Sequence, residues 1–133
     1  MKEEATLSEV GMYVAQGCLV VPIQLELDDE LVSKVQQEIL EQLVKTRAKG
    51  LIVDLARVAV IDSVLGKAIF DIAGMASLLG TVTVITGIGP GVAASLIDLD
   101  FEPGDVLTAT TMEVGFEVLS TRFARLKTEP GKD

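Results

Sequence analysis

The sequence predicts an α/β fold: one domain with a mixed, largely parallel sheet of about five strands and about four packed helices, entered through an N-terminal β-hairpin. A length of 133 residues suits a single domain with one core. With one Tyr, four Phe and no Trp, the core must be built from Val, Ile, Leu and Ala, as is common where helices cover parallel strands. After the hairpin, strand and helix patterns alternate, which implies parallel strands joined by right-handed crossovers.

The hairpin is predicted from two strand-like runs, residues 9–15 and 18–27, separated by the turn residues Gln16 and Gly17. Pro22 cannot donate to a strand ladder, so we expect its strand to lie near a sheet edge or to bend there. Cys18 is the only cysteine and lies in an apolar run, which predicts a buried thiol without a disulfide partner.

A first helix is predicted over residues 28–48, because Asp28 or Asp29 can cap its start and apolar residues then recur at helical spacing. Gly50 is predicted to stop this helix, and residues 51–55 are typical of a buried strand. The apolar stripe of the helix comprises Leu31, Val32, Val35, Ile39, Leu40, Leu43 and Val44.

A second helix is predicted from Asp62 or Ser63 to a stop at Gly80. Its inward stripe comprises Leu65, Ala68, Ile69, Ile72, Ala76 and Leu79. Its opposite face carries Ser63, Gly66, Lys67, Phe70, Gly74 and Ser77, with Asp71 close by. Each of the two glycines costs about 1 kcal/mol relative to Ala inside a helix. Two explanations stay open: a partner-binding face formed by Gly66, Phe70, Asp71 and Gly74, or close packing of this face against a loop of the same domain.

The remaining elements complete the alternation. Residues 81–86 are rich in β-branched residues and predict a strand, and a helix over residues 90–98 follows with Pro90 at its first position. A short strand is expected over residues 106–109. Thr110 and Glu113 form a capping-box pattern that opens a last helix, to about residue 126. The predicted domain therefore spans residues 9–126, with flexible ends at residues 1–8 and 127–133.

Charge and composition exclude several classes of function. The net charge of −9 disfavours nucleic acid and anionic membranes as partners, whereas a basic protein partner would be attracted. One Cys and no His cannot supply a metal cluster, and no cofactor is expected. The start of the sequence lacks the apolar region of a signal peptide, and no apolar run is long enough to span a membrane, so a cytoplasmic protein is predicted.

The Asp62-Ser63 pair at a helix start is the strongest candidate site. A serine hydrolase needs a base, usually His, and this chain has none; a Ser63–Lys67 pair is conceivable, but nothing nearby favours Lys67 as a base. A phosphate on Ser63 would be stabilised by the N–H groups and dipole of the helix start, and Lys67 could pair with it. Asp62 or Ser63 could equally be a simple N-cap. The residues alone leave both interpretations open.

The glycine-rich turn over residues 87–91 is a second candidate. It follows a strand and opens a helix, where backbone N–H groups can hold a phosphate. It lacks the third glycine of the dinucleotide-binding pattern, since Val92 stands there, and it lacks the Gly-Lys-Ser/Thr ending of a P-loop. A tight turn is one interpretation, and a small-ligand or nucleotide-binding module is the alternative function.

The sequence resembles STAS domains of the anti-sigma-factor antagonist family, and within it the small single-domain stressosome scaffold proteins. The resemblance covers roughly residues 9–126. It is carried by Cys18-Leu19-Val20-Val21, Ile23-Gln24, Glu26-Leu27-Asp28-Asp29, Gly50 to Leu55, Ile61-Asp62-Ser63 with Lys67, Thr86-Gly87-Ile88-Gly89-Pro90, Val92-Ala93 and Leu96-Ile97. Sporulation-type antagonists tend to have Gly where this chain has Leu65, which favours the stressosome branch.

The resemblance implies a function as well as a fold. It maps a phospho-acceptor serine onto Ser63, with Asp62 beside it. It implies a non-enzymatic scaffold that holds a switch-type serine/threonine kinase and releases it on phosphorylation, and a cognate phosphatase that resets Ser63. It also implies assembly with STAS-domain co-scaffold proteins into a larger particle, with a homodimer as the expected unit.

Overall fold

The computed structural model describes residues 11–24, 28–101 and 106–128. The predicted flexible ends lie outside these residues, except that 127 and 128 continue the last helix. The described strands are β1 (Tyr13–Ala15), β2 (Cys18–Pro22), β3 (Gly50–Asp54), β4 (Val82–Thr86) and β5 (Leu107–Ala109). The described helices are α2 (Asp29–Thr46), α3 (Ser63–Leu78), α4 (Pro90–Asp98) and α5 (Met112–Thr128).

The strands form one five-stranded sheet in the order β1-β2-β3-β4-β5. The β1–β2 hairpin is antiparallel, and each later pair is parallel. The predicted α/β class and the mixed, largely parallel sheet are therefore confirmed. Pro22 is the last residue of β2 and lies beyond the residues that pair with β1, so it interrupts no ladder on that side.

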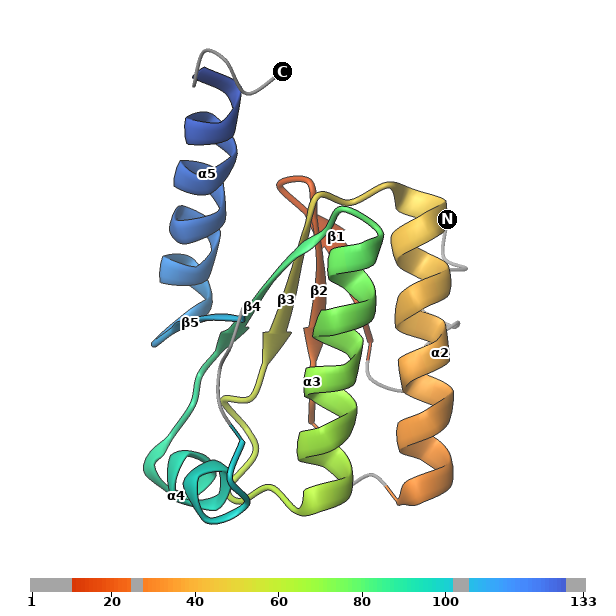
Figure 1. The fold of residues 1–133 in the computed structure, drawn as a ribbon, viewed down its shortest axis with the longest axis vertical. Helices are drawn as coiled ribbons and strands as arrows, with labels where there is room; N and C mark the ends of the chain where they lie inside the picture. The colour runs from red at the N-terminus through yellow and green to blue at the C-terminus, as the bar shows by residue number, and fades with distance from the viewer. Residues whose placement is uncertain (1–10, 25–27, 102–105, 129–133) are drawn as a thin grey trace.

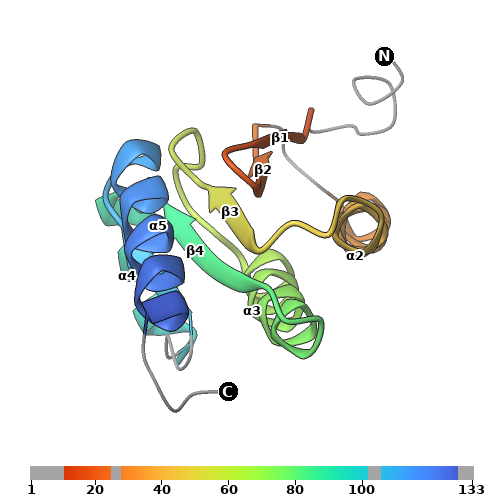
Figure 2. The same cartoon turned by 90° about the horizontal axis from the view of Figure 1, so that it is seen from above.

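Helices cover both faces of the sheet. Helices α2 and α3 lie side by side on one face, α5 packs on the other, and α4 lies beyond the ends of β3 and β4 (Figures 1 and 2). The β4 residues alternate accordingly, since Ile85 belongs to the core beneath α2 and α3, whereas Val84 belongs to the core beneath α5. Cys18 is buried on the α5 side, and its burial raises the pKa of the thiol.

Helix α2 begins as predicted and ends differently. The Asp28 carboxylate accepts a hydrogen bond from the Leu31 N–H at 2.8 Å, which is the expected N-cap. The helix stops at Arg47, which adopts the left-handed conformation with φ of 56°, so the predicted stop at Gly50 is wrong. Gly50 instead opens β3, where an added Cβ would lie 2.9 Å from both the Cys18 Sγ and a Leu119 methyl carbon. It is required there for close packing.

Three further expectations need correction. Thr111, and not Thr110, caps α5, because its hydroxyl accepts from the Val114 N–H at 3.1 Å. Leu79, predicted to lie on the inward stripe of α3, is 49% exposed, since the helix ends at Leu78. Val44 is 63% exposed although it lies within α2, because it lies about 100° around the helix from the buried Leu43 and so falls outside the buried stripe.

Candidate functional site

The start of α3 places Ser63 on the surface. Asp62 has an extended backbone, and its carboxylate accepts a hydrogen bond from the Leu65 N–H at 2.9 Å. Asp62 is therefore the N-cap, and Ser63 is the first residue of the helix. The Ser63 side chain is exposed, and its hydroxyl makes no hydrogen bond to another described residue. Capping is thus performed by the neighbour, which leaves the serine hydroxyl accessible at the positive end of the helix dipole.

The loop that leads to Asp62 is held from two sides. Its first residue, Leu55, donates its N–H to the Thr86 carbonyl of β4 at 2.8 Å. At its other end, the side chain of Ile61 is buried, and the Ile61 N–H donates to the Ser95 hydroxyl of α4 at 3.4 Å. The Ser95 hydroxyl in turn donates to the Gly91 carbonyl at 2.8 Å. These contacts fix the position from which α3 starts.

Two glycines of the turn over residues 87–91 pack against this same loop. Gly87 has φ of 73°, and an added Cβ would lie 2.7 Å from the Ala56 backbone nitrogen. A Cβ on Gly91 would collide with the Ala59 carbonyl oxygen. Both glycines therefore allow the turn to pack closely on the loop before Asp62, as the tight-turn interpretation expects.

Around Ser63 the exposed side chains are a mixture of aliphatic and charged groups. Val60 is 67% exposed and Val64 is 41% exposed. One turn after Ser63, the Lys67 Nζ lies 2.8 Å from the Asp71 carboxylate. Both members of this i,i+4 pair are exposed, so the pair contributes only about 0.3–0.5 kcal/mol and can rearrange at little cost.

The predicted partner-binding residues separate into two groups. Gly66 is buried, and an added Cβ would lie 2.9 Å from the ring of Phe101. The half-buried Phe70 stacks on the same ring, with centroids 5.2 Å apart and planes inclined by 6°. Asp71 and Gly74, in contrast, are exposed, and nothing lies within 4 Å of a Cβ placed on Gly74. Gly66 and Phe70 therefore show the close packing against a loop of the same domain that was the alternative explanation for this face.

The sequence interpretation missed three residues of this region. Phe101 follows α4 and belongs to no periodic pattern, so no local signal connected it with α3. Val60 is an aliphatic residue in the connection between β3 and α3, and no sequence pattern marks it as exposed. Val64 alone carried a signal, because it falls outside the inward stripe of α3.

The described residues also bear on two other classes of site. In the described residues, no group of three or more His, Cys, Asp or Glu side chains is arranged to hold a metal ion. No helix within the same residues is long and apolar enough to cross a membrane.

Comparison with known proteins identifies the family. Residues 9–112 match the STAS domain family. Two curated relatives from Bacillus subtilis (strain 168) are the RsbT co-antagonist proteins RsbRA, 24% identical over 84% of this chain, and RsbRD, 26% identical over 80% of it. The matched regions span only 40% and 38% of those two proteins.

Solved structures agree with this assignment. A single-substitution variant of Moorella thermoacetica RsbS is 30% identical, with a TM-score of 0.78 over 89% of this chain and 99% of that one. A chain in a solved structure of the stressosome is 27% identical, with a TM-score of 0.72 over 84% of this chain and 96% of that one. The chain therefore belongs to the STAS-domain family, in agreement with the resemblance to anti-sigma-factor antagonists that its sequence shows.

Proposed function

We propose that this chain is a non-enzymatic scaffold of a stressosome-type assembly and a phospho-switch. In the unphosphorylated form it holds a partner serine/threonine kinase, and phosphorylation of Ser63 releases that kinase. The observation that carries the proposal is the helix start, where Asp62 performs the capping and leaves the Ser63 hydroxyl exposed and unbonded among the described residues. The similarity to RsbS and to a stressosome chain supports the class of function.

The geometry is suited to a phosphate. A phosphate on Ser63 would add about −1.5 to −2 charges beside the N–H groups at the start of α3, where negative charge is favoured. Lys67 lies one turn further along, and its pair with Asp71 is exposed and weak. The phosphate would compete with Asp71 for Lys67. Phosphorylation would therefore change the charge pattern of the surface while leaving the fold intact.

The kinase-binding surface is proposed to centre on Ser63. The exposed Val60 and Val64 would supply apolar contact on either side of the acceptor, and Asp71 and Gly74 are exposed further along α3. Gly66 and Phe70 would contribute indirectly, because they support Phe101. The net charge of −9 favours a partner with a basic docking face.

Partners follow from the relatives. The names of RsbRA and RsbRD describe them as RsbT co-antagonists, which makes RsbT the first candidate partner to test. STAS-domain co-scaffold proteins, a cognate phosphatase and a homodimer complete the proposed assembly, and a cytoplasmic location is proposed with it.

A hydrolase is not proposed, because the chain has no His to act as base for Ser63. The contacts of Gly87 and Gly91 favour a tight turn, so the ligand-binding alternative at that turn has no specific support.

The test is phosphorylation followed by release. The chain is incubated with purified RsbT and ATP, and the modified residue is mapped by mass spectrometry. We expect phosphate on Ser63 and no phosphate in Ser63→Ala. The control is Ser77→Ala, which removes an exposed serine near the other end of α3 and should still be phosphorylated on Ser63. Phosphate found only at another residue would refute the acceptor assignment.

A retention assay tests the switch itself. Ser63→Asp mimics part of the phosphate charge and should fold normally, because an acidic residue is favourable in the first helical turn. Immobilised Ser63→Asp should retain at least about tenfold less RsbT than the unmodified chain. Equal retention by both forms would contradict a charge-driven release.

A further inference from the structure

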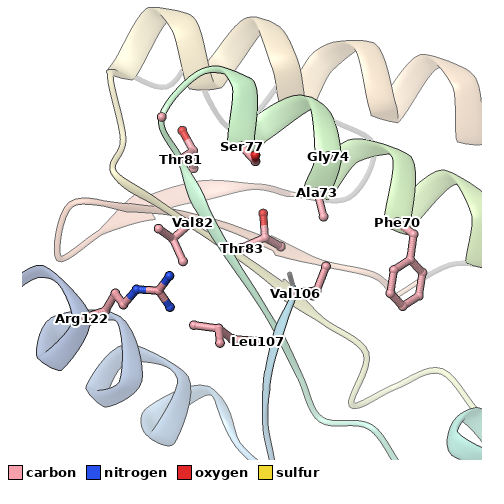
Figure 3. A pocket seen from close by; sticks show the side chains of 11 residues that line it. Phe70, Ala73, Gly74, Ser77, Thr81, Val82, Thr83, Val106, Leu107 and Arg122 are labelled. Carbon is pink, nitrogen blue, oxygen red and sulfur yellow. The ribbon is translucent and has the colours of Figure 1, made fainter. Parts of the chain in front are cut away.

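A groove of about 720 Å3 opens between the C-terminal half of α3, the start of β4 and helix α5 (Figure 3). Ser63 lies at the opposite end of α3. Gly74 and Ser77 form part of its α3 wall, and Arg122 of α5 lies on the opposite side. Between these walls, Val82 and Leu107 provide apolar surface. The groove is open beside Gly74, where a Cβ would meet no atom within 4 Å.

Thr83 is the unusual residue of this groove. Its side chain is only 5% exposed, yet its hydroxyl has no hydrogen-bond partner among the described residues. Two other threonines at this strand, equally buried, are satisfied: Thr81 donates to the Ala48 carbonyl at 3.2 Å, and Thr86 donates to the Asp54 carboxylate at 2.7 Å. A buried hydroxyl without a partner is costly, and valine would fill the same space without that cost.

Thr83 and Arg122 both line the groove. Figure 3 shows the hydroxyl directed toward α3 and the guanidinium reaching from α5 toward β4. No carboxylate of a described residue is paired with Arg122, although the chain carries an excess of nine negative charges. A guanidinium without a carboxylate partner is a strong hydrogen-bond donor to a carboxylate or phosphate ligand.

We infer that this groove binds a small organic acid that carries a second polar group. Its carboxylate would pair with Arg122, its carbon chain would lie along Val82 and Leu107, and its second polar group would hydrogen-bond to Thr83. The volume of the groove, about 720 Å3, is within the range of small-molecule sites, which favours a small molecule. The inference is independent of Ser63 and of the proposed phospho-switch.

The first test is a titration followed by amide NMR chemical shifts. The probes are 4-hydroxybutyrate, butyrate and inorganic phosphate. Butyrate lacks the second polar group, and phosphate lacks the carbon chain as well, so the three affinities show what each part of the ligand contributes. We expect saturable shifts at the amides of Gly74, Gly80 and Thr83, with 4-hydroxybutyrate binding more tightly than butyrate and both more tightly than phosphate. Absence of saturation with 4-hydroxybutyrate would overturn the inference, and so would tightest binding by phosphate.

Matched variants assign the contacts. Arg122→Gln should weaken 4-hydroxybutyrate binding about tenfold or more, because a charge-assisted hydrogen bond is lost. Arg125→Gln, which makes the same charge change on the same helix outside this groove, should bind within about twofold of the original chain. Equal weakening by both variants would mean a general charge effect and would refute the site.

Thr83→Val tests the second polar contact without risking the fold, because it removes a hydroxyl that leaves no described partner behind. The melting temperature should be unchanged or raised. The affinity for 4-hydroxybutyrate should fall to that for butyrate, while butyrate itself binds as before. If 4-hydroxybutyrate keeps its advantage in this variant, Thr83 does not contact the ligand and the inferred pose is wrong.

Discussion

Gly66 and Gly74 lie two turns apart in α3 and look equivalent in the sequence, but the structure gives them opposite surroundings. Gly66 is covered by Phe101, and no room exists for a Cβ. Gly74 borders an open groove and meets nothing. The difference shows that a small residue in a helix can serve close packing or leave a surface open, and that only its neighbours in space distinguish the two cases. It also divides α3 into a packed half and an open half.

Among the substitutions that test the contrast between Gly66 and Gly74, Phe101→Ala is expected to lower the free energy of unfolding most. The ring covers Gly66 and stacks on Phe70, so its removal loses both buried area and an aromatic contact. We expect the free energy of unfolding to fall by about 2–3 kcal/mol, somewhat below the value for a fully buried Phe. Urea unfolding followed by circular dichroism measures the change. A loss below about 0.5 kcal/mol would mean that Phe101 does not stabilise α3.

Gly66→Ala is expected to cause the second largest change in the free energy of unfolding. The new methyl group would crowd the Phe101 ring, which costs more than the roughly 1 kcal/mol that Ala gains over Gly in a helix. The net expectation is a loss of about 1–2 kcal/mol in the free energy of unfolding. Combining Gly66→Ala with Phe101→Ala should remove the clash, so that the alanine becomes neutral or stabilising in that background. Equal losses in both backgrounds would point away from the ring as the cause.

Gly74→Ala should have the smallest effect and the opposite sign. No atom lies near its Cβ position, so only the helix propensity changes, and the free energy of unfolding should rise by about 0.5–1 kcal/mol. The same urea experiment measures it. If Gly66→Ala and Gly74→Ala shift stability in the same direction, the contrast between the packed and the open half of α3 is wrong.

The contrast between Gly66 and Gly74 also limits which residues of α3 a partner can contact directly. A partner that docks near Ser63 meets Val60, Val64 and the Lys67–Asp71 pair, whereas Gly66 lies beneath Phe101. The partner-binding role of Gly66, Phe70, Asp71 and Gly74 stays a prediction. The inferred ligand groove lies in the open half of the helix, so its occupancy and the phosphorylation of Ser63 can be measured separately.

Much of the fold was predictable because its signals are local. Asp28 and Asp62 cap their helices through hydrogen bonds to N–H groups three residues away, and these were recognisable from the order of residue types. The errors were local as well. Thr111 took the capping position predicted for Thr110, one residue away. Arg47 ended α2 three residues before the predicted Gly50 by adopting the left-handed conformation, which the residue type alone does not indicate for an arginine.

The sequence by itself determined the alternation of strands and helices, the helix start at Asp62-Ser63 and the absence of a histidine base. Each depends on composition or on residues within one helical turn. Only the tertiary structure decided that Gly66 is packed and Gly74 open, that Gly87 and Gly91 hold the loop before Asp62, and that Thr83 and Arg122 line one groove. These facts depend on residues distant in the chain, and no local pattern encodes which of them meet in the folded core.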